Sequence, residues 1–162
     1  MSRHRVLFVC LGNICRSPTG EGLLKALVAE QGLEDVVEVD SAGTGAWHVG
    51  EPPDRRMSEA ASRRGYRLGG SARQVTGSEL PSWDMVVAMD RENLADLRVM
   101  ADGATAGGRE VPLRLFSEFL PEGSPVDVPD PYYGGEEGFD RVLDLVEEGC
   151  ANLLDELVAG SD

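Results

Sequence analysis

The chain alternates between short, continuous apolar runs and longer stretches in which apolar residues recur at helical spacing. The short runs predict buried strands at 6–9, 36–41 and 85–89, and an alternating pattern predicts an edge strand at 111–115. The longer stretches predict helices over 18–31, 53–64, 90–100 and 136–158, with a short helical turn over 76–80. Because helices separate the strands, we expect an α/β fold with a parallel sheet between two helical layers.

The junction between the first strand and the first helix carries the clearest chemistry. Cys10 ends the strand, and a short loop leads to Arg16, followed by Ser17 as a helix N-cap and Pro18 at the first helical position. Backbone amides in such a loop have no intrahelical partner and favour an oxyanion, aided by the helix dipole. The same field favours the nucleophilic thiolate form of Cys10, and the planar guanidinium of Arg16 is suited to clamping phosphate oxygens.

The residues inside the loop fit the same use. Gly12 allows backbone that a β-carbon would obstruct, and Asn13 tolerates a left-handed conformation. A cysteine at the end of a core strand is more often inert packing, but the flanking strand, the Gly-Asn pair and the Ser-Pro pair favour a functional loop. The predicted phosphate-binding residues are Leu11, Gly12, Asn13, Ile14, Cys15, Arg16 and Ser17.

The segment CLGNICRSPTGEGLL resembles the low-molecular-weight protein tyrosine phosphatase family, and the DPYY motif at 130–133 resembles a second mark of that family. Further similarity at 40–44, 47–50, 72–74 and 89–90 extends the resemblance, in order, over nearly the whole chain. It implies one domain over 1–162, a three-layer α/β/α sandwich with a central four-stranded parallel sheet. It also implies hydrolysis of phosphotyrosine proteins and aryl phosphates through a cysteinyl-phosphate, with inorganic phosphate as product.

Asp130 is the predicted proton donor. Cleavage of an aryl phosphate leaves a phenolate that needs a proton, and Asp130 lies in a loop stiffened by Pro129 and Pro131. An Asp-Pro pair alone is an ordinary turn signal, but before two tyrosines it resembles the general acid of the family. We expect burial beside the bound phosphate to keep this carboxyl protonated in the complex.

The resemblance also implies roles for residues around the loop. Ser17 would steady the Cys10 thiolate, in addition to or instead of capping the helix, while Asn13 and Ser41 would brace the loop. The family often has a histidine before its Ala-Arg pair, where Gly70 stands in this chain. We therefore expect support for the loop to come from elsewhere.

Three aromatic residues and a second cysteine complete the predicted site. Trp47 and Tyr132 match family positions that form the walls of a slot for an aromatic phosphate ester, and Tyr133 is a weaker candidate. Trp47 and Tyr132 could equally be core aromatics. In the family, the nucleophilic cysteine forms a disulfide with a neighbouring cysteine on oxidation, and Cys15 matches that neighbour. The alternative interpretation is that Cys15 is a small loop residue without a redox role.

Composition bounds the partners and the location. The formal net charge of −14 argues against nucleic acid and anionic membranes as partners. The arginines at 54–73 could form a basic patch that steers an acidic phosphopeptide to the site, but a solvated helix face is the favoured interpretation. No apolar stretch predicts a membrane span or a signal peptide, and three cysteines suit a reducing compartment, so we expect a cytoplasmic protein and a monomer. His4 and His48 offer no metal-ligand spacing, and we expect neither a metal nor a cofactor.

Three other functions are weighed against a tyrosine phosphatase. Arsenate reductases of this fold need further cysteines, but Ser82 and Trp83 stand in the relevant region and only Cys150 remains. Bacterial protein arginine phosphatases have threonine at the position of Ile14 and lack the tyrosine pair. A noncatalytic phosphate-binding module would lack the nucleophile or the acid, and this chain has both candidates.

Overall fold

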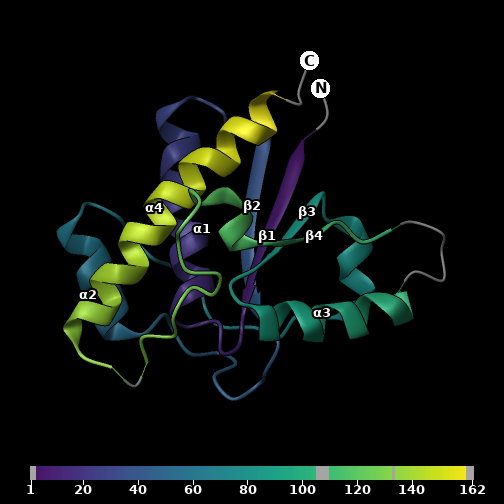
Figure 1. The fold of residues 1–162 in the computed structure, drawn as a ribbon, viewed down its shortest axis with the longest axis horizontal. Coiled ribbons are helices and arrows are strands. Elements are labelled where there is room, and N and C mark those ends of the chain that lie inside the picture. Colours follow the sequence, from purple (N-terminus) through teal and green to yellow (C-terminus); the bar gives the residue numbers. More distant parts are fainter. Residues whose placement is uncertain (1–2, 105–109, 133, 160–162) are drawn as a thin grey trace.

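Four parallel strands form the central sheet of the computed structural model, which describes residues 3–104, 110–132 and 134–159. The strands are β1 (His4–Cys10), β2 (Val37–Gly43), β3 (Met85–Ala88) and β4 (Leu113–Leu115). Their order across the sheet is β2-β1-β3-β4, which places β1 in the centre and β4 at an edge (Figure 1). The structure confirms the predicted parallel sheet and the edge position of β4.

Helices cover both faces of the sheet (Figure 1). One face packs against α1 (Arg16–Glu30), α2 (Arg55–Arg63) and α4 (Glu136–Ala159), and the other against α3 (Arg91–Ala104) and the 3-10 helix η1 (Gly77–Ser82). Val6 and Phe8 of β1 belong to the first core, whereas Leu7 and Val9 belong to the second. Because side chains alternate between faces and both faces are covered, β1 is apolar at every one of these positions.

The longest helix, α4, presents one apolar side to the core. Its buried residues are Phe139, Val142, Leu143, Val146, Gly149, Cys150, Leu153, Leu154 and Leu157, as the helical spacing predicts. Gly149 lies against the ring of Phe116, which belongs to the short 3-10 helix η3 (Phe116–Phe119). Of the helices in the described residues, none combines the length and apolarity that spanning a membrane requires.

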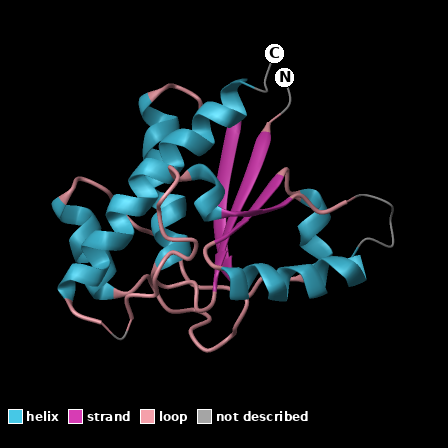
Figure 2. Cartoon of the chain, in the orientation of Figure 1, coloured by secondary structure: helices cyan, strands magenta, loops and turns pink. Residues whose placement is uncertain are grey.

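The carboxyl ends of the strands lie at one end of the sheet, where the connecting loops gather (Figure 2). Cys10 at the end of β1 pairs with Gly43 at the end of β2, and Met89 follows β3 directly. Parallel α/β sheets bind ligands at this end because the loops that follow the strands converge there. The fold therefore brings the segments around Cys10, Ser41 and Asp90 to one place.

The predicted start of the first helix is wrong by two residues. Helix α1 begins at Arg16, its N-cap position is Cys15, and no side chain caps it. Pro18 therefore occupies the third helical position, where its missing N–H still costs no helical hydrogen bond. Ser17 does not cap the helix because its hydroxyl lies 3.0 Å from the sulfur of Cys10 instead.

Candidate active site

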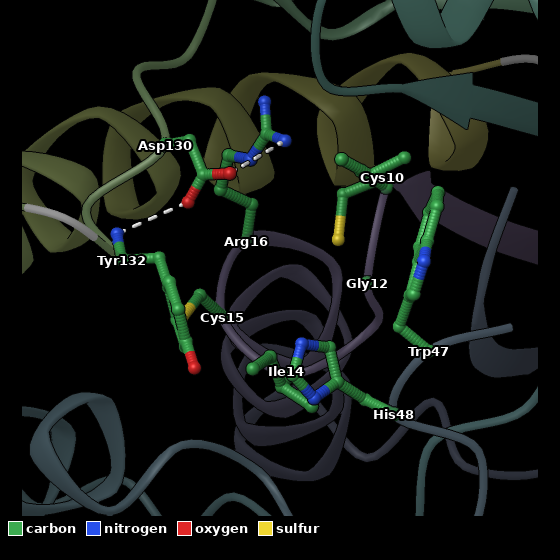
Figure 3. A pocket seen from close by; sticks show the side chains of 10 residues that line it. Cys10, Gly12, Ile14, Cys15, Arg16, Trp47, His48, Asp130 and Tyr132 are labelled. Atoms are coloured by element: carbon green, nitrogen blue, oxygen red, sulfur yellow. Dashed lines mark hydrogen bonds and ion pairs between the residues drawn. The ribbon is translucent and has the colours of Figure 1, made fainter. Parts of the chain in front are cut away.

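A pocket opens at the carboxyl end of the sheet, beside the loop from β1 to α1 (Figure 3). It has a volume of about 440 Å³. The lining residues come from three distant parts of the sequence and are Cys10, Leu11, Gly12, Ile14, Cys15, Arg16, Trp47, His48, Asp130 and Tyr132. The structure thus brings together the predicted nucleophile, guanidinium clamp, proton donor and two rim aromatics.

In the loop from β1 to α1, the carbonyls of Leu11 and Ile14 accept hydrogen bonds, whereas the backbone amides stay available. The Leu11 carbonyl accepts a hydrogen bond from the Gly45 amide (2.9 Å), and the Ile14 carbonyl accepts one from the Asp54 amide (2.8 Å). Within the part of the chain that the structure describes, the amides of 11–15 donate to no protein acceptor. A run of unpaired amides before a helix N-terminus is suited to binding an oxyanion.

Two residues allow the tight path of this loop. Asn13 has a φ of 57°, in the left-handed region that asparagine tolerates better than most residues. On the neighbouring strand, a β-carbon at Gly43 would lie 2.6 Å from the Leu11 carbonyl oxygen. Glycine at position 43 therefore lets the loop pass close to the end of β2.

The sulfur of Cys10 lies at the floor of the pocket. Its residue is only 2% exposed, and its Sγ is 3.0 Å from Ser17 Oγ and 3.4 Å from the Ser17 amide nitrogen. Asn13 Nδ2 donates to the same hydroxyl (2.8 Å), so the hydroxyl hydrogen can point to the sulfur. Both Ser17 groups can therefore donate to a thiolate at this position.

A hydrogen-bond network braces the loop from behind. Asn13 Nδ2 also donates to Ser41 Oγ (3.0 Å), and Ser41 in turn donates to Glu21 Oε1 (2.6 Å). The Arg73 amide donates to Asn13 Oδ1 (3.0 Å) and supplies support in a chain without the usual histidine. At Gly70, even an added β-carbon would contact nothing within 4 Å. Sequence reasoning predicted Asn13 and Ser41 but missed Glu21 and Arg73.

Arg16 is almost fully buried, with a side chain only 4% exposed. Its Nη1 donates to Asp90 Oδ2 (2.6 Å) and to the Val128 carbonyl (3.2 Å), and its Nη2 lies 3.5 Å from Asp130 Oδ2. Burial opposes the charge, but Cys10 and the two aspartates outweigh it and raise the pKa of Arg16 above its usual value. Asp90 was predicted only as a helix cap. It performs that role through Oδ1, which accepts from the Asn93 amide.

Asp130 faces the pocket from the loop before α4 (Figure 3). Its Oδ1 accepts a hydrogen bond from the Tyr132 amide (3.1 Å). Its side chain is 42% exposed in the protein alone, and the burial expected from the sequence concerns the complex with bound phosphate. A bound substrate would have to supply the remaining cover.

Aromatic side chains stand around the mouth. Trp47 is 74% exposed and lies across the pocket from Tyr132, whose ring centre is 5.7 Å from that of His48 (Figure 3). Trp47 is exposed, Tyr132 is half-buried and packs at the edge of the first core, and Tyr133 falls outside the described residues. No role at the rim was predicted for His48. Because His48 directly follows Trp47 in the sequence, its neighbour's predicted place at the rim could have indicated a place there for His48 as well.

The other two cysteines are also free thiols. Cys15 lines the pocket, where burial, followed by the Asp54 and Cys10 charges, raises its pKa well above the usual range. Cys150 is completely buried in α4, which raises its pKa as well, and its Sγ lies 3.7 Å from the Gly20 carbonyl oxygen. Cys150 therefore packs in the core, as its helical position predicted.

Four arginines of the arginine-rich segment pair with carboxylates. Arg64 is held by Asp140, Asp144 and Glu147 of α4. The others with acidic partners pair as follows: Arg55 with Glu59, Arg56 with Asp54, and Arg73 with Asp40 and Glu79. These pairs favour a structural explanation for the arginines over electrostatic steering of an acidic peptide.

Fold and pocket together define the class of cysteine-dependent phosphatases, because a buried thiol, a buried guanidinium and unpaired loop amides meet at one anion site. Residues 5–161 match the family model for low molecular weight phosphotyrosine protein phosphatases, and the chain belongs to this family. It is 44% identical over 153 residues to a low molecular weight protein-tyrosine-phosphatase of Streptomyces coelicolor, with coverage of 93% of this chain and 92% of the relative.

Solved structures show the same relationship. YfkJ from Bacillus subtilis superimposes with a TM-score of 0.89 at 39% identity, over 100% of this chain and 99% of YfkJ. The Drosophila arginine phosphatase DARP also gives a TM-score of 0.89, at 32% identity, over 97% of this chain and 99% of DARP. The three-layer fold is therefore shared by relatives whose names refer to different phosphorylated residues.

Proposed function

We propose that this protein hydrolyses phosphotyrosine in proteins, and aryl phosphates in general, through a phosphate ester of Cys10. The observation that carries the proposal is the meeting of Cys10, Arg16 and Asp130 in one pocket whose loop amides are unpaired. Each group fits one requirement of phosphate ester cleavage: a nucleophile, a counter-charge and a proton donor.

In the first step, the Cys10 thiolate attacks phosphorus while the bond from phosphorus to the tyrosine oxygen breaks. Asp130 gives its proton to the departing oxygen, so the product is neutral tyrosine. Arg16 and the amides of 11–15 bind the equatorial phosphate oxygens as negative charge develops there. Because Asp90 and the Val128 carbonyl already fix the guanidinium, little rearrangement is needed when the substrate binds.

In the second step, water attacks the phosphorus of the cysteinyl-phosphate. Asp130, now a carboxylate, takes a proton from that water, the bond from sulfur to phosphorus breaks, and inorganic phosphate is released. The Ser17 hydroxyl, 3.0 Å from the sulfur, stabilises the thiolate as it departs. The chain thereby returns to its starting state.

The depth of the pocket supports an aromatic substrate. The nucleophilic sulfur is nearly inaccessible at the floor, whereas Trp47, His48 and Tyr132 stand at the mouth. A phosphotyrosine ring is long enough to reach the sulfur while it contacts these aromatic walls, and a phosphoserine side chain is too short.

A second candidate is hydrolysis of phosphoarginine, favoured by the structural similarity to DARP. Ile14 at the pocket and the tyrosine pair at 132–133 favour phosphotyrosine, because bacterial arginine phosphatases have threonine and lack that pair. Phosphate release from matched phosphotyrosine and phosphoarginine peptides separates the two. Faster release from the arginine peptide would refute our assignment.

The roles of the residues are tested with two substitutions. Asp130→Ala should lower kcat/KM on phenyl phosphate about 10²-fold or more, and less on 4-nitrophenyl phosphate, whose leaving group needs a proton less. Cys10→Ser should abolish turnover but keep binding of a phosphotyrosine peptide. Asp155→Ala, an exposed change on α4, serves as the control. Equal losses on both esters would remove Asp130 as the proton donor.

The finer expectations from the sequence stay predictions. A cytoplasmic location agrees with three free thiols, and a monomer is expected. Under oxidation, Cys10 and Cys15 are expected to form a reversible disulfide that protects the nucleophile. Phosphate release after peroxide treatment, with and without a thiol reductant, measures that protection in wild type and in Cys15→Ser.

A further inference from the structure

An arginine outside the pocket, Arg56, contacts the segment that carries Asp130. Building on the proposed function, we infer that Arg56 is a positioning residue for the proton transfer. It lies in the first turn of α2 and does not line the pocket. It holds the segment 130–132 through Tyr132 and thereby fixes where the Asp130 carboxyl lies.

The guanidinium of Arg56 contacts Tyr132 in two ways. Its Nη2 donates to the Tyr132 carbonyl oxygen (2.9 Å), and its central carbon lies 5.5 Å from the centre of the Tyr132 ring. The same carbon lies 4.9 Å from the centre of the Phe139 ring in α4. A planar guanidinium can donate along its edge and lie against aromatic rings with its faces. Arg56 therefore links the segment of Asp130 to the helix that follows it.

The other side of Arg56 is tied to the phosphate-binding loop. Its Nη2 lies 3.2 Å from Asp54 Oδ2, and the Asp54 carboxylate also caps α2 by accepting from the Arg56 and Met57 amides. The Asp54 amide donates to the Ile14 carbonyl. One chain of contacts thus runs from the loop that holds the anion, through Asp54 and Arg56, to Tyr132.

The last link of this chain reaches the acid itself. The Tyr132 amide donates to Asp130 Oδ1, and Oδ2 faces Arg16 at 3.5 Å (Figure 3). Because the Asp130 side chain is 42% exposed, packing fixes it only in part, and its contact with the Tyr132 amide helps to set its position. A displacement of about 1 Å at a reacting group can cost about 10²-fold in rate. The contact of Arg56 with Tyr132 therefore bears on proton transfer.

The substitution that tests this inference is Arg56→Met, which keeps an unbranched side chain and removes the donor. We expect kcat/KM to fall about tenfold or more on phenyl phosphate and less than about threefold on 4-nitrophenyl phosphate, because only the poorer leaving group depends strongly on the acid. Arg56→Lys, which can still donate to the Tyr132 carbonyl, should restore part of the loss on phenyl phosphate.

The neighbouring arginine provides a matched control. Arg55 has a side chain that is 91% exposed and pairs with Glu59 on the same helix. Arg55→Met should leave both rates within about twofold of wild type, since a surface pair of this kind contributes little. Asp54→Asn keeps a capping oxygen but loses the charge that orients Arg56. Its kcat/KM should fall less than that of Arg56→Met, and again more on phenyl phosphate than on 4-nitrophenyl phosphate.

The outcomes separate this inference from the proposed function. Equal losses on both esters for Arg56→Met, or no loss, would overturn the positioning role even though wild type forms a cysteinyl-phosphate. Absence of that intermediate in wild type would instead refute the proposed function. Thermal unfolding of each variant shows whether it is folded. If Arg56→Met does not fold, Asp54→Asn provides the test: equal losses on the two esters, or no loss, would then overturn the positioning role of Arg56.

Discussion

Arg16 is a buried cation whose neighbours hold it ready for an anion. Asp90 binds one terminal nitrogen, and the other nitrogen faces Asp130 beside the pocket (Figure 3). A guanidinium can satisfy these partners and still present a planar pair of donors to phosphate, whereas an ammonium is a single point charge. The side chain therefore acts through its shape as well as its charge.

Arg16→Lys tests this argument. We expect kcat/KM on a phosphotyrosine peptide to fall about 10² to 10³-fold, the range seen when a preorganised oxyanion donor is lost. The control is Arg91→Lys, because Arg91 pairs with Asp127 at the surface and should tolerate the change. An Arg16→Lys variant with activity near wild type would show that positive charge alone suffices.

The sequence revealed the groups that perform chemistry more readily than those that position them. Cys10 and Arg16 stand in one short loop, so local pattern identifies them. Glu21, Arg73 and the second role of Asp90 arise only when strands, helices and loops are packed together. Such contacts join residues far apart in the chain, and neither periodicity nor spacing encodes them.

The secondary structure elements were predictable where burial dictates the pattern. The strands β1 and β3 and the helix α4 follow from their apolar patterns, because β1 and β3 are buried almost throughout and α4 buries one whole face. The start of α1 was misplaced because Ser17 matches a capping residue, yet its hydroxyl contacts the Cys10 sulfur. A functional requirement thus replaced the ordinary cap, and local propensity alone does not detect this.

Helix α4 offers a prediction in which two effects oppose each other. Gly149→Ala should gain about 1 kcal/mol from helix propensity, but the new methyl group would overlap the ring of buried Phe116, and overpacking of this kind costs about 1 to 3 kcal/mol. We expect a lower free energy of unfolding in urea. Gly103→Ala near the end of α3, where a β-carbon contacts nothing within 4 Å, should not destabilise. A stabilised Gly149→Ala variant would contradict the packing of α4 against η3.

Across the whole molecule, acidic residues outnumber basic ones and give a net charge of −14. The pairs of Arg64 with α4 and of Arg73 with Asp40 use part of this excess to tie distant segments together, and Arg73 also pairs with nearby Glu79. Burial works against the charge of Glu79, but hydrogen bonds from Arg73 and Thr76 outweigh it and lower the pKa of Glu79 to about 2. The folded state therefore holds this carboxylate ionised below its ordinary pKa of 4.5.

This shift predicts a pH dependence of stability. Since the folded pKa lies below the unfolded one, Glu79 stabilises the fold fully above about pH 4.5, and the contribution is lost as the pH falls toward 2. Urea unfolding at a series of acidic pH values should show that Glu79→Gln is less stable than wild type near neutrality. The gap should close by about 1 kcal/mol per pH unit below 4.5. A gap that stays constant would contradict the role of this pair.

The central claim is that phosphorus passes through the sulfur of Cys10, and direct capture of the phosphorylated enzyme tests it. Wild type is quenched during turnover of 4-nitrophenyl phosphate, digested, and examined by mass spectrometry with fragmentation. We predict one phosphate on Cys10 in wild type and in Cys15→Ser, and none in Cys10→Ser, which is also inactive. Turnover that continues without phosphate on Cys10, or that survives in Cys10→Ser, would contradict the account.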